Sequence, residues 1–202
     1  GQGLGTIIDN EGPPSIVIGD VTVNEGDGTV SVPVTLSSPS SVDTVIDIVT
    51  NTGTAGTADY TTTTIQVTIP AGSLTVNVII PILEDLLDEP NETFTVDGTL
   101  VSGTIDTAAS DFQGEVTIVD NDGTPTVTIG DVTVNEGDGT ASVPVTLSSP
   151  SSVDTVIDIV TTTGTAGTAD YTTTTIQVTI PAGSLTVNVI IPILEDLLDE
   201  PN

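Results

Sequence analysis

The feature that most constrains the fold of this chain is an internal repeat with a period of 111 residues. The segment VTVNEGDGT occurs at residues 21–29 and again at 132–140, an offset of 132 − 21 = 111. When residues 1–91 are laid on residues 112–202, 11 positions differ and 91 − 11 = 80 are identical. One folding unit must therefore fit within one period, which is an ordinary size for a domain. Identity this high indicates a recent duplication within a tandem array.

The phase of the repeat predicts where each module begins and ends. Residues 3–14, GLGTIIDNEGPP, match residues 114–125, GEVTIVDNDGTP, so residues 1–11 are expected to be the last strand of a preceding module. Residues 14–122 are then a complete module. Residues 125–202 are a second module that stops before its last two strands. Because an incomplete sheet exposes unpaired edges, we expect either that the array continues or that a neighbouring chain supplies the missing strands.

Apolar and polar residues alternate with a period of two, which is typical of half-buried β-strands. The strands predicted for the complete module are residues 15–23, 30–36, 44–50, 65–69, 74–82, 93–100 and 115–119. Turn segments such as EGDGT and PAGS separate them. Seven short strands in one period predict an all-β fold of tandem seven-stranded, immunoglobulin-like Greek-key sandwiches. Pro33 and Pro81 are expected at sheet edges or bulges, and Tyr60, Tyr171 and Phe94 in the cores.

The charge balance excludes several classes of function. The chain has 29 Asp and Glu residues and no Lys, Arg or His, so its formal net charge is −29. Such a polyanion is repelled by nucleic acids and by anionic membrane surfaces, and no apolar stretch is long enough to be inserted into a membrane. Without His, Cys or Lys the usual catalytic bases are missing, so we expect no enzyme. The absence of Cys excludes disulfides.

Most carboxylates lie in the predicted loops, whereas Thr, Ser and Asn occupy the polar strand positions. Hard cations such as Ca²⁺ take six to eight oxygen ligands, often from flexible loops. Loops that converge at one end of a sandwich are able to supply them. Spacing alone leaves a second interpretation open, in which these are solvated acidic loops without a bound ion.

Four segments of the complete module together resemble the Calx-beta domain. They are VTVNEGDGT (21–29), GTAGTADY (53–60), VIIPILEDLLDEPNETFTV (78–96) and GEVTIVDND (114–122), in family order and spacing. This family is the calcium-binding module of sodium/calcium exchangers and also occurs in arrays in bacterial and algal surface proteins. The resemblance implies a seven-stranded sandwich that holds calcium at one tip.

The resemblance also implies a set of calcium ligands. In the complete module they are Glu25, Asp59, Glu84, Asp85, Asp120 and Asp122, and in the second module Glu136, Asp170, Glu195 and Asp196. Possible additional ligands are Asp9, Asp27, Asp88 and Glu89, whereas Glu92 is expected to cap or solvate the following strand. Leu86 and Ala58 stand where the exchanger domain has acidic residues, which implies fewer ions or weaker affinity.

The function that we expect is an extracellular or cell-surface array, a structural or adhesive stalk or fibre subunit that calcium stiffens at its loop tips and module joints. Its expected partners are adjacent modules, with possible self-assembly into fibres by strand complementation. Two alternatives stay open: a calcium-sensing regulatory module, and an acidic surface repeat from a halophile without specific metal sites. Near-identical copies favour the stalk, because repetition adds length.

Overall fold

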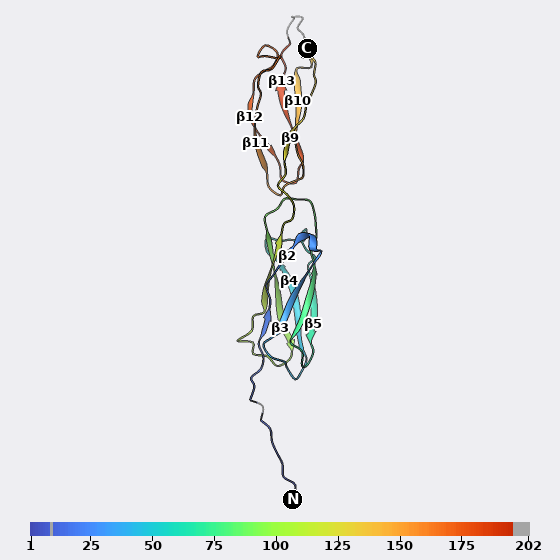
Figure 1. Cartoon of the computed structure of the whole chain (residues 1–202), viewed down its shortest axis with the longest axis vertical. Coiled ribbons are helices and arrows are strands. Elements are labelled where there is room, and N and C mark those ends of the chain that lie inside the picture. The colour runs from blue at the N-terminus through green and yellow to red at the C-terminus, as the bar shows by residue number, and fades with distance from the viewer. Residues whose placement is uncertain (9, 196–202) are drawn as a thin grey trace. The chain divides into compact units, whose positions relative to one another are not determined.

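A computed structural model describes residues 1–8 and 10–195 of the chain. The described residues divide into two compact units, which are treated separately below. The first contains strands β1 to β8 and the second contains strands β9 to β13 (Figure 1). Apart from single 3-10 turns, the regular structure in this part of the chain consists of strands, which confirms the all-β prediction.

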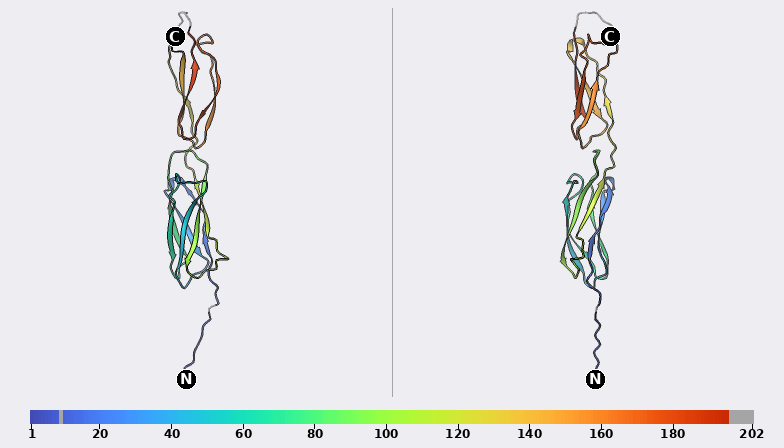
Figure 2. Two further views of the ribbon diagram at one scale, coloured as in Figure 1. Left: turned by 180° about the vertical axis from the view of Figure 1, so that it is seen from behind. Right: turned by 90° about the vertical axis from the view of Figure 1, so that its left-hand side faces the viewer.

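The first unit is a sandwich of two sheets. Its strands are β1 (Ile16–Ile18), β2 (Val21–Asn24), β3 (Thr29–Leu36), β4 (Thr44–Thr52), β5 (Thr64–Ile69), β6 (Thr75–Pro81), β7 (Glu92–Ser102) and β8 (Gln113–Val119). One sheet has the order β1-β3-β6 and the other β2-β8-β7-β4-β5, and the two form separate layers (Figure 2). Neighbouring strands are antiparallel except β2 and β8, which run parallel.

The prediction of one strand over residues 15–23 is wrong, because the chain changes sheets at Gly19 and Asp20. The backbone N–H of Gly19 donates to the carbonyl of Pro33 at 2.9 Å, but Pro33 has no N–H to return the bond, and β1 ends at Ile18. A Cβ on Gly19 would lie 2.9 Å from the Pro33 ring. The Asp20 carboxylate then accepts the N–H of Glu115 at 2.8 Å, which directs the chain to the sheet of β8.

The positions predicted for the two prolines have different outcomes in the structure. Pro81 ends β6, an edge strand, as predicted. Pro33 lies in β3, which is the central strand of its sheet, so the prediction of an edge position is wrong. Its missing donor is accommodated at the point where β1 gives way to β2.

The core of the first unit lies between the sheets and follows the period-two pattern of the strands. In β3 the alternating residues Val30, Val32, Val34 and Leu36 are buried. Tyr60 and Phe94 are fully buried, with ring centroids 3.9 Å apart and planes inclined by 10°, which confirms their predicted core positions. This stack ties the loop before β5 to β7.

The second unit contains five strands among the described residues 122–195. They are β9 (Val127–Ile129), β10 (Thr140–Leu147), β11 (Thr155–Val160), β12 (Thr175–Ile180) and β13 (Thr186–Pro192). They form a sheet of order β13-β10-β9 and a second sheet of β11 and β12. Counterparts of β7 and β8 are not present in this part of the chain. As a consequence residues 132–135, identical in sequence to β2, form no strand, and Tyr171 is only half-buried.

Residues 1–8 and 10–15 form no strand, so the strand predicted for residues 1–11 stays a prediction. Leu4, Ile7 and Ile8 are exposed by 95%, 99% and 82%.

Candidate metal centre

Glu25 is placed by a single 3-10 turn, η1 (Glu25–Asp27), which directly follows β2. The Asp27 carboxylate accepts hydrogen bonds from the backbone N–H of Asn24 at 3.0 Å and from its side-chain amide at 3.3 Å. Gly28 ends the turn with φ 74°, a left-handed conformation that favours glycine. Asp27, a possible additional ligand by sequence, thus holds the turn that carries Glu25, whose side chain is only 5% exposed.

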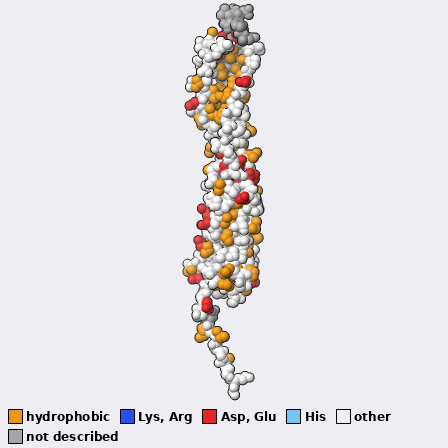
Figure 3. Space-filling view, in the orientation of Figure 1, with side chains coloured by type: hydrophobic (Ala, Val, Ile, Leu, Met, Phe, Trp, Pro, Cys, Tyr) orange, Lys and Arg blue, Asp and Glu red, His pale blue; other side chains and the backbone are white. Residues whose placement is uncertain are grey.

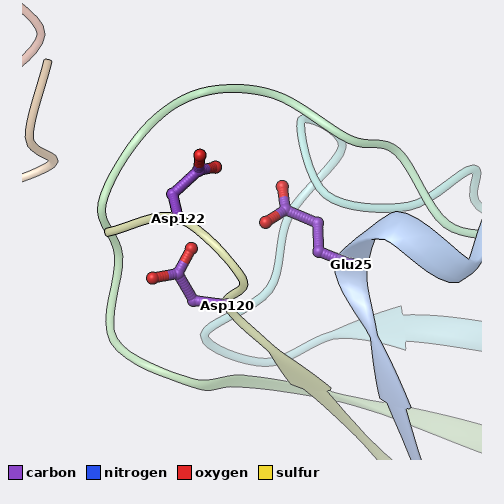
Figure 4. Close-up of side chains that lie close together, drawn as sticks. All are labelled: Glu25, Asp120 and Asp122. Carbon is purple, nitrogen blue, oxygen red and sulfur yellow. The ribbon is translucent and has the colours of Figure 1, made fainter. Parts of the chain in front are cut away.

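Glu25, Asp120 and Asp122 form the first carboxylate cluster. One carboxylate oxygen from each lies within 4.8 Å of the others, and the three side chains lie close together (Figure 4). The strands explain this proximity, because β2 and β8 are parallel and Asn24 pairs with Val119. Residues that follow the two strands must therefore emerge at the same edge of the sheet.

Asp59, Glu89 and Glu92 form the second cluster, again with ligand oxygens within 4.8 Å of one another. The Asp59 carboxylate accepts the N–H of Gly56 at 2.5 Å, and the backbone carbonyl of Asp59 accepts the N–H of Leu83 at 2.8 Å. These two hydrogen bonds fix the bend before Tyr60 on two sides. All three acidic side chains are partly buried.

Glu92 is the site residue that sequence reasoning assigned to another role. It begins β7, two residues before Phe94, and Asp59 directly precedes Tyr60. Because Tyr60 and Phe94 stack, the acidic residues before them are brought to the same end of the sandwich. The signal that could have identified Glu92 is the pair of aromatic residues with an acidic residue one position before Tyr60 and two positions before Phe94.

The other acidic residues of the 84–89 loop take different positions. Glu84 accepts hydrogen bonds from the Asn121 side-chain amide at 3.2 and 3.4 Å, which places it beside the first cluster. Asp85 accepts the N–H of Leu87 at 2.6 Å. Glu84, Asp85 and Asp88 belong to neither of the two clusters found among the described residues. Gly26 is closely packed here, since a Cβ on it would lie 2.8 Å from the Asn121 amide nitrogen.

The second unit repeats part of this arrangement. Asp138 accepts the backbone N–H of Asn135 at 2.8 Å and so holds η2 (Glu136–Asp138) as Asp27 holds η1. Asp170 accepts the N–H of Gly167 at 2.6 Å, and a Cβ on Gly137 would lie 4.0 Å from an oxygen of Glu195. Within residues 122–195 no three carboxylates form a cluster of this kind. Asp9 and Asp196, two further predicted ligands, lie outside the described residues.

The residues of both clusters fit a hard divalent cation. Every donor is a carboxylate oxygen, the ligand type that Ca²⁺ prefers. The sequence contains no Lys, Arg or His, so no cationic side chain anywhere in the chain balances these groups. Unit charges 4 Å apart repel by about 1 kcal/mol even at the dielectric constant of water, and by more at a partly buried site. Three gathered carboxylates are thus a site at which an external cation is favoured.

Comparison with known proteins identifies the family. The Calx-beta domain profile matches residues 9–122 and 120–202. No curated protein sequence matches the chain. The fold is similar to the crystal structure of CBD12 from CALX1.2, with TM-score 0.50 and 19% identity over 89% of this chain and 74% of that one. It is also similar to the apo form of the Calx CBD1 domain, with TM-score 0.50 and 22% identity over 55% of this chain and 99% of that one. The chain belongs to the Calx-beta domain family.

Proposed function

We propose that the complete module binds Ca²⁺ at its tip through Glu25, Asp120 and Asp122 and through Asp59, Glu89 and Glu92. The observation that carries the proposal is the gathering of two carboxylate triads in a chain without any cationic side chain. Membership of the Calx-beta domain family supports it, because this family includes the calcium-binding module of sodium/calcium exchangers. If these loops were solvated without a bound ion, nothing would offset the electrostatic repulsion between the carboxylates that converge in them.

Each triad joins segments that are distant in sequence. The first holds the turn after β2 to the residues after β8, and the second holds the bend before Tyr60 to the start of β7. Bound calcium supplies positive charge that offsets the repulsion within each triad. The protein supplies Glu25 in a fixed and buried position, so little side-chain freedom is lost when an ion binds.

The first triad also bears on the joint between modules. Asp120 and Asp122 immediately precede the Gly123-Thr124-Pro125 segment, where the second copy of the repeat begins. When their carboxylates are held to Glu25, the beginning of this linker is anchored to the first module. A short linker with proline is already restricted, and anchoring removes further freedom.

We infer from this a structural role, in which the chain is part of an extracellular or cell-surface stalk or fibre that calcium stiffens. Two copies with 80 of 91 aligned residues identical add length, which a stalk uses and a single regulatory sensor does not. Three carboxylates per cluster fit the weak binding of extracellular calcium modules, whose Kd is roughly 10⁻⁴–10⁻³ M. Among the described residues no helix has the length and hydrophobicity needed to cross a membrane.

Calorimetric titration with CaCl₂ in concentrated NaCl tests the binding proposal. Saturable binding is expected for the native chain, and loss of one class of site for Glu25→Gln. The matched control is Glu115→Gln, which removes the same charge at an exposed position of β8. If the native chain shows no saturable binding, the proposal fails and the halophilic interpretation is favoured.

Small-angle scattering with calcium and with EDTA tests the structural role separately. We expect a longer and better defined maximum dimension with calcium. An unchanged scattering profile together with saturable binding would remove the stiffening role and favour the sensor.

A further inference from the structure

Strand β5 forms a free edge of the first unit. It is the last strand in the order β2-β8-β7-β4-β5, and no strand among the described residues pairs with its outer side. The backbone N–H of Thr50 in β4 donates to the carbonyl of Thr63 at 3.0 Å. Because hydrogen-bonded pairs alternate along antiparallel strands, every second residue after Thr63 faces β4, and the outward backbone groups are those of Thr64, Gln66 and Thr68.

The opposite edges of the two sheets show how this module protects a strand from unwanted pairing. β1 has three residues, and Asp111 covers its outer side by donating to Ile16 at 2.7 Å and accepting from Ile18 at 3.0 Å. β2 has four residues and lies between Asp20 and Glu25. Short length, a covering segment and flanking charges all prevent edge-to-edge association. β5 has six residues and none of these three protections.

The sequence around β5 is uncharged. Residues 60–83, which contain β5 and the edge strand β6 of the other sheet, include no acidic residue, and residues 171–194 repeat them without a change. These two stretches are the longest in the chain without a carboxylate. Figure 3 shows, on one face of the molecule, exposed acidic side chains with no cationic side chain among them. A second copy of the chain, with the same charge of −29, therefore meets the least repulsion at this edge.

We propose that β5 pairs edge to edge with β5 of a second copy of this chain. Antiparallel pairing with Gln66 opposite Gln66 of the second copy places Thr64 opposite Thr68, and so pairs all three outward residues. Each opposed pair exchanges two hydrogen bonds, about six in all, and any shift of the register leaves at least one outward residue unpaired. The contact is isologous, so two five-stranded sheets become one continuous sheet across a two-fold axis.

The side chains at this edge fit the proposed pairing. Ile65 is 48% exposed although its alternate neighbours Val67 and Ile69 are buried, and in this register it lies beside Val67 of the second copy. On the other face Asp47, opposite Gln66 in the register of β4 and β5, accepts a hydrogen bond from the Gln66 amide at 2.8 Å. The two Asp47 residues of the dimer are three strand spacings apart, about 14 Å. This separation exceeds the Debye length of about 8 Å at physiological ionic strength.

Sedimentation velocity over a range of protein concentrations, in EDTA and concentrated NaCl, tests the proposal. We expect the weight-average mass of the native chain to rise with concentration. Gln66→Pro combined with Gln177→Pro, its counterpart in the repeat, should abolish the rise, because proline removes an outward N–H but none that bonds to the neighbouring strand. Gln66→Ala combined with Gln177→Ala is the matched control. It keeps both N–H groups and should associate like the native chain.

A charge at the same positions blocks the pairing without a change in the backbone. Gln66→Glu combined with Gln177→Glu places like charges directly opposite one another in the dimer and should also abolish the rise. The control for added charge is Ser31→Glu combined with Ser142→Glu, at exposed positions of the central strands β3 and β10. It should associate like the native chain. Circular dichroism should show the same strand content in all of these variants.

Because the chain contains no Cys, a single introduced cysteine tests the register directly. The Cα atoms of two directly opposed residues in a hydrogen-bonded pair are about 5.5 Å apart, within the range of roughly 4.4–6.8 Å that a disulfide spans. Gln66→Cys should therefore form a disulfide-linked dimer on mild oxidation, whereas Ser31→Cys should stay monomeric. Equal cross-linking of the two variants would overturn the proposal.

Two results of the sedimentation experiment would also overturn it. One is a native chain that stays monomeric at every protein and salt concentration, and the other is association that the Pro and Glu variants retain, which would place the contact on another surface. The inference goes beyond calcium binding and uses none of the six clustered carboxylates. Since sedimentation is measured in EDTA, failure of edge pairing leaves the calcium titration as it is, and failure of calcium binding leaves the mass distribution as it is.

Discussion

Replacement of Glu25 by Gln should change the stability of the first unit in opposite directions with and without calcium. Glu25 is only 5% exposed, and its carboxylate lies within 4.8 Å of those of Asp120 and Asp122. Gln preserves the size of the side chain but removes its charge. Without an ion the substitution removes two like-charge pairs, whereas with calcium it removes one ligand.

The magnitude follows from the distance. At 4.8 Å, each pair of unit charges repels by about 0.9 kcal/mol at the dielectric constant of water and by about 3.5 kcal/mol at an effective value of 20. Two pairs at the lower value predict that Glu25→Gln raises the free energy of unfolding in EDTA by about 2 kcal/mol. For a unit of this size the melting temperature should rise by roughly 8 °C. In saturating calcium the variant should be the less stable of the two.

Urea unfolding followed by tyrosine fluorescence measures this effect in the whole chain. A Tyr171→Phe background leaves Tyr60 as the sole tyrosine, and Tyr60 is stacked on Phe94 in the core of the first unit. Glu115→Gln is the control for net charge and should change the free energy of unfolding by less than about 0.5 kcal/mol. If Glu25→Gln is less stable than the native chain in EDTA as well, the account of the triad as a repulsive cluster is wrong.

Three further substitutions have predicted outcomes. Phe94→Ala should lower the free energy of unfolding of the first unit by about 3–5 kcal/mol because it leaves a cavity in the core. Ile65→Ala, at a side chain that is 48% exposed, should lower it much less. Urea unfolding of the two variants measures the difference. Gly26→Ala should weaken calcium binding because its Cβ would lie 2.8 Å from a neighbouring side chain, whereas Gly137→Ala, with 4.0 Å of space, should not; calorimetric titration of both decides this. Glu92→Gln should reduce the number of bound calcium ions while leaving the Glu25 site occupied, and an unchanged stoichiometry would exclude Glu92 as a ligand.

Much of the fold of the first unit is visible in the sequence because strands such as β3 and β4 alternate between buried and more exposed residues. The strand predicted over residues 30–36 is observed as β3 (Thr29–Leu36), and that over 65–69 as β5 (Thr64–Ile69). The break at Gly19 was missed because it depends on Pro33, which is distant in sequence. The local alternation of apolar and polar residues does not show with which strand a segment pairs.

The second unit shows the same limit more directly. VTVN at residues 132–135 has the sequence of β2 and forms no strand, because no β8 lies beside it among the described residues. Strand formation here depends on the neighbouring strand more than on the propensity of Val and Thr. The repeat could therefore predict which segments are able to pair, but not which pair in this chain.

The sequence predicted the site residues that directly follow the ends of strands. It did not predict the site residues whose positions depend on tertiary contacts. Glu25 and Asp120 were expected together, and the parallel pairing of β2 and β8 brings them into one cluster. Glu92 was assigned to strand capping because its approach to Asp59 requires the stack of Tyr60 on Phe94. The carboxylates of Glu84 and Asp85 lie outside both clusters because hydrogen bonds within the loops engage them.

The most direct test of the central claim is a crystal structure grown in calcium, with anomalous scattering from a terbium-soaked crystal to locate the ions. We predict one peak bounded by Glu25, Asp120 and Asp122 and another bounded by Asp59, Glu89 and Glu92, with calcium–oxygen distances of about 2.3–2.6 Å. No peak at either triad, or ions held only by carboxylates outside them, would contradict the account.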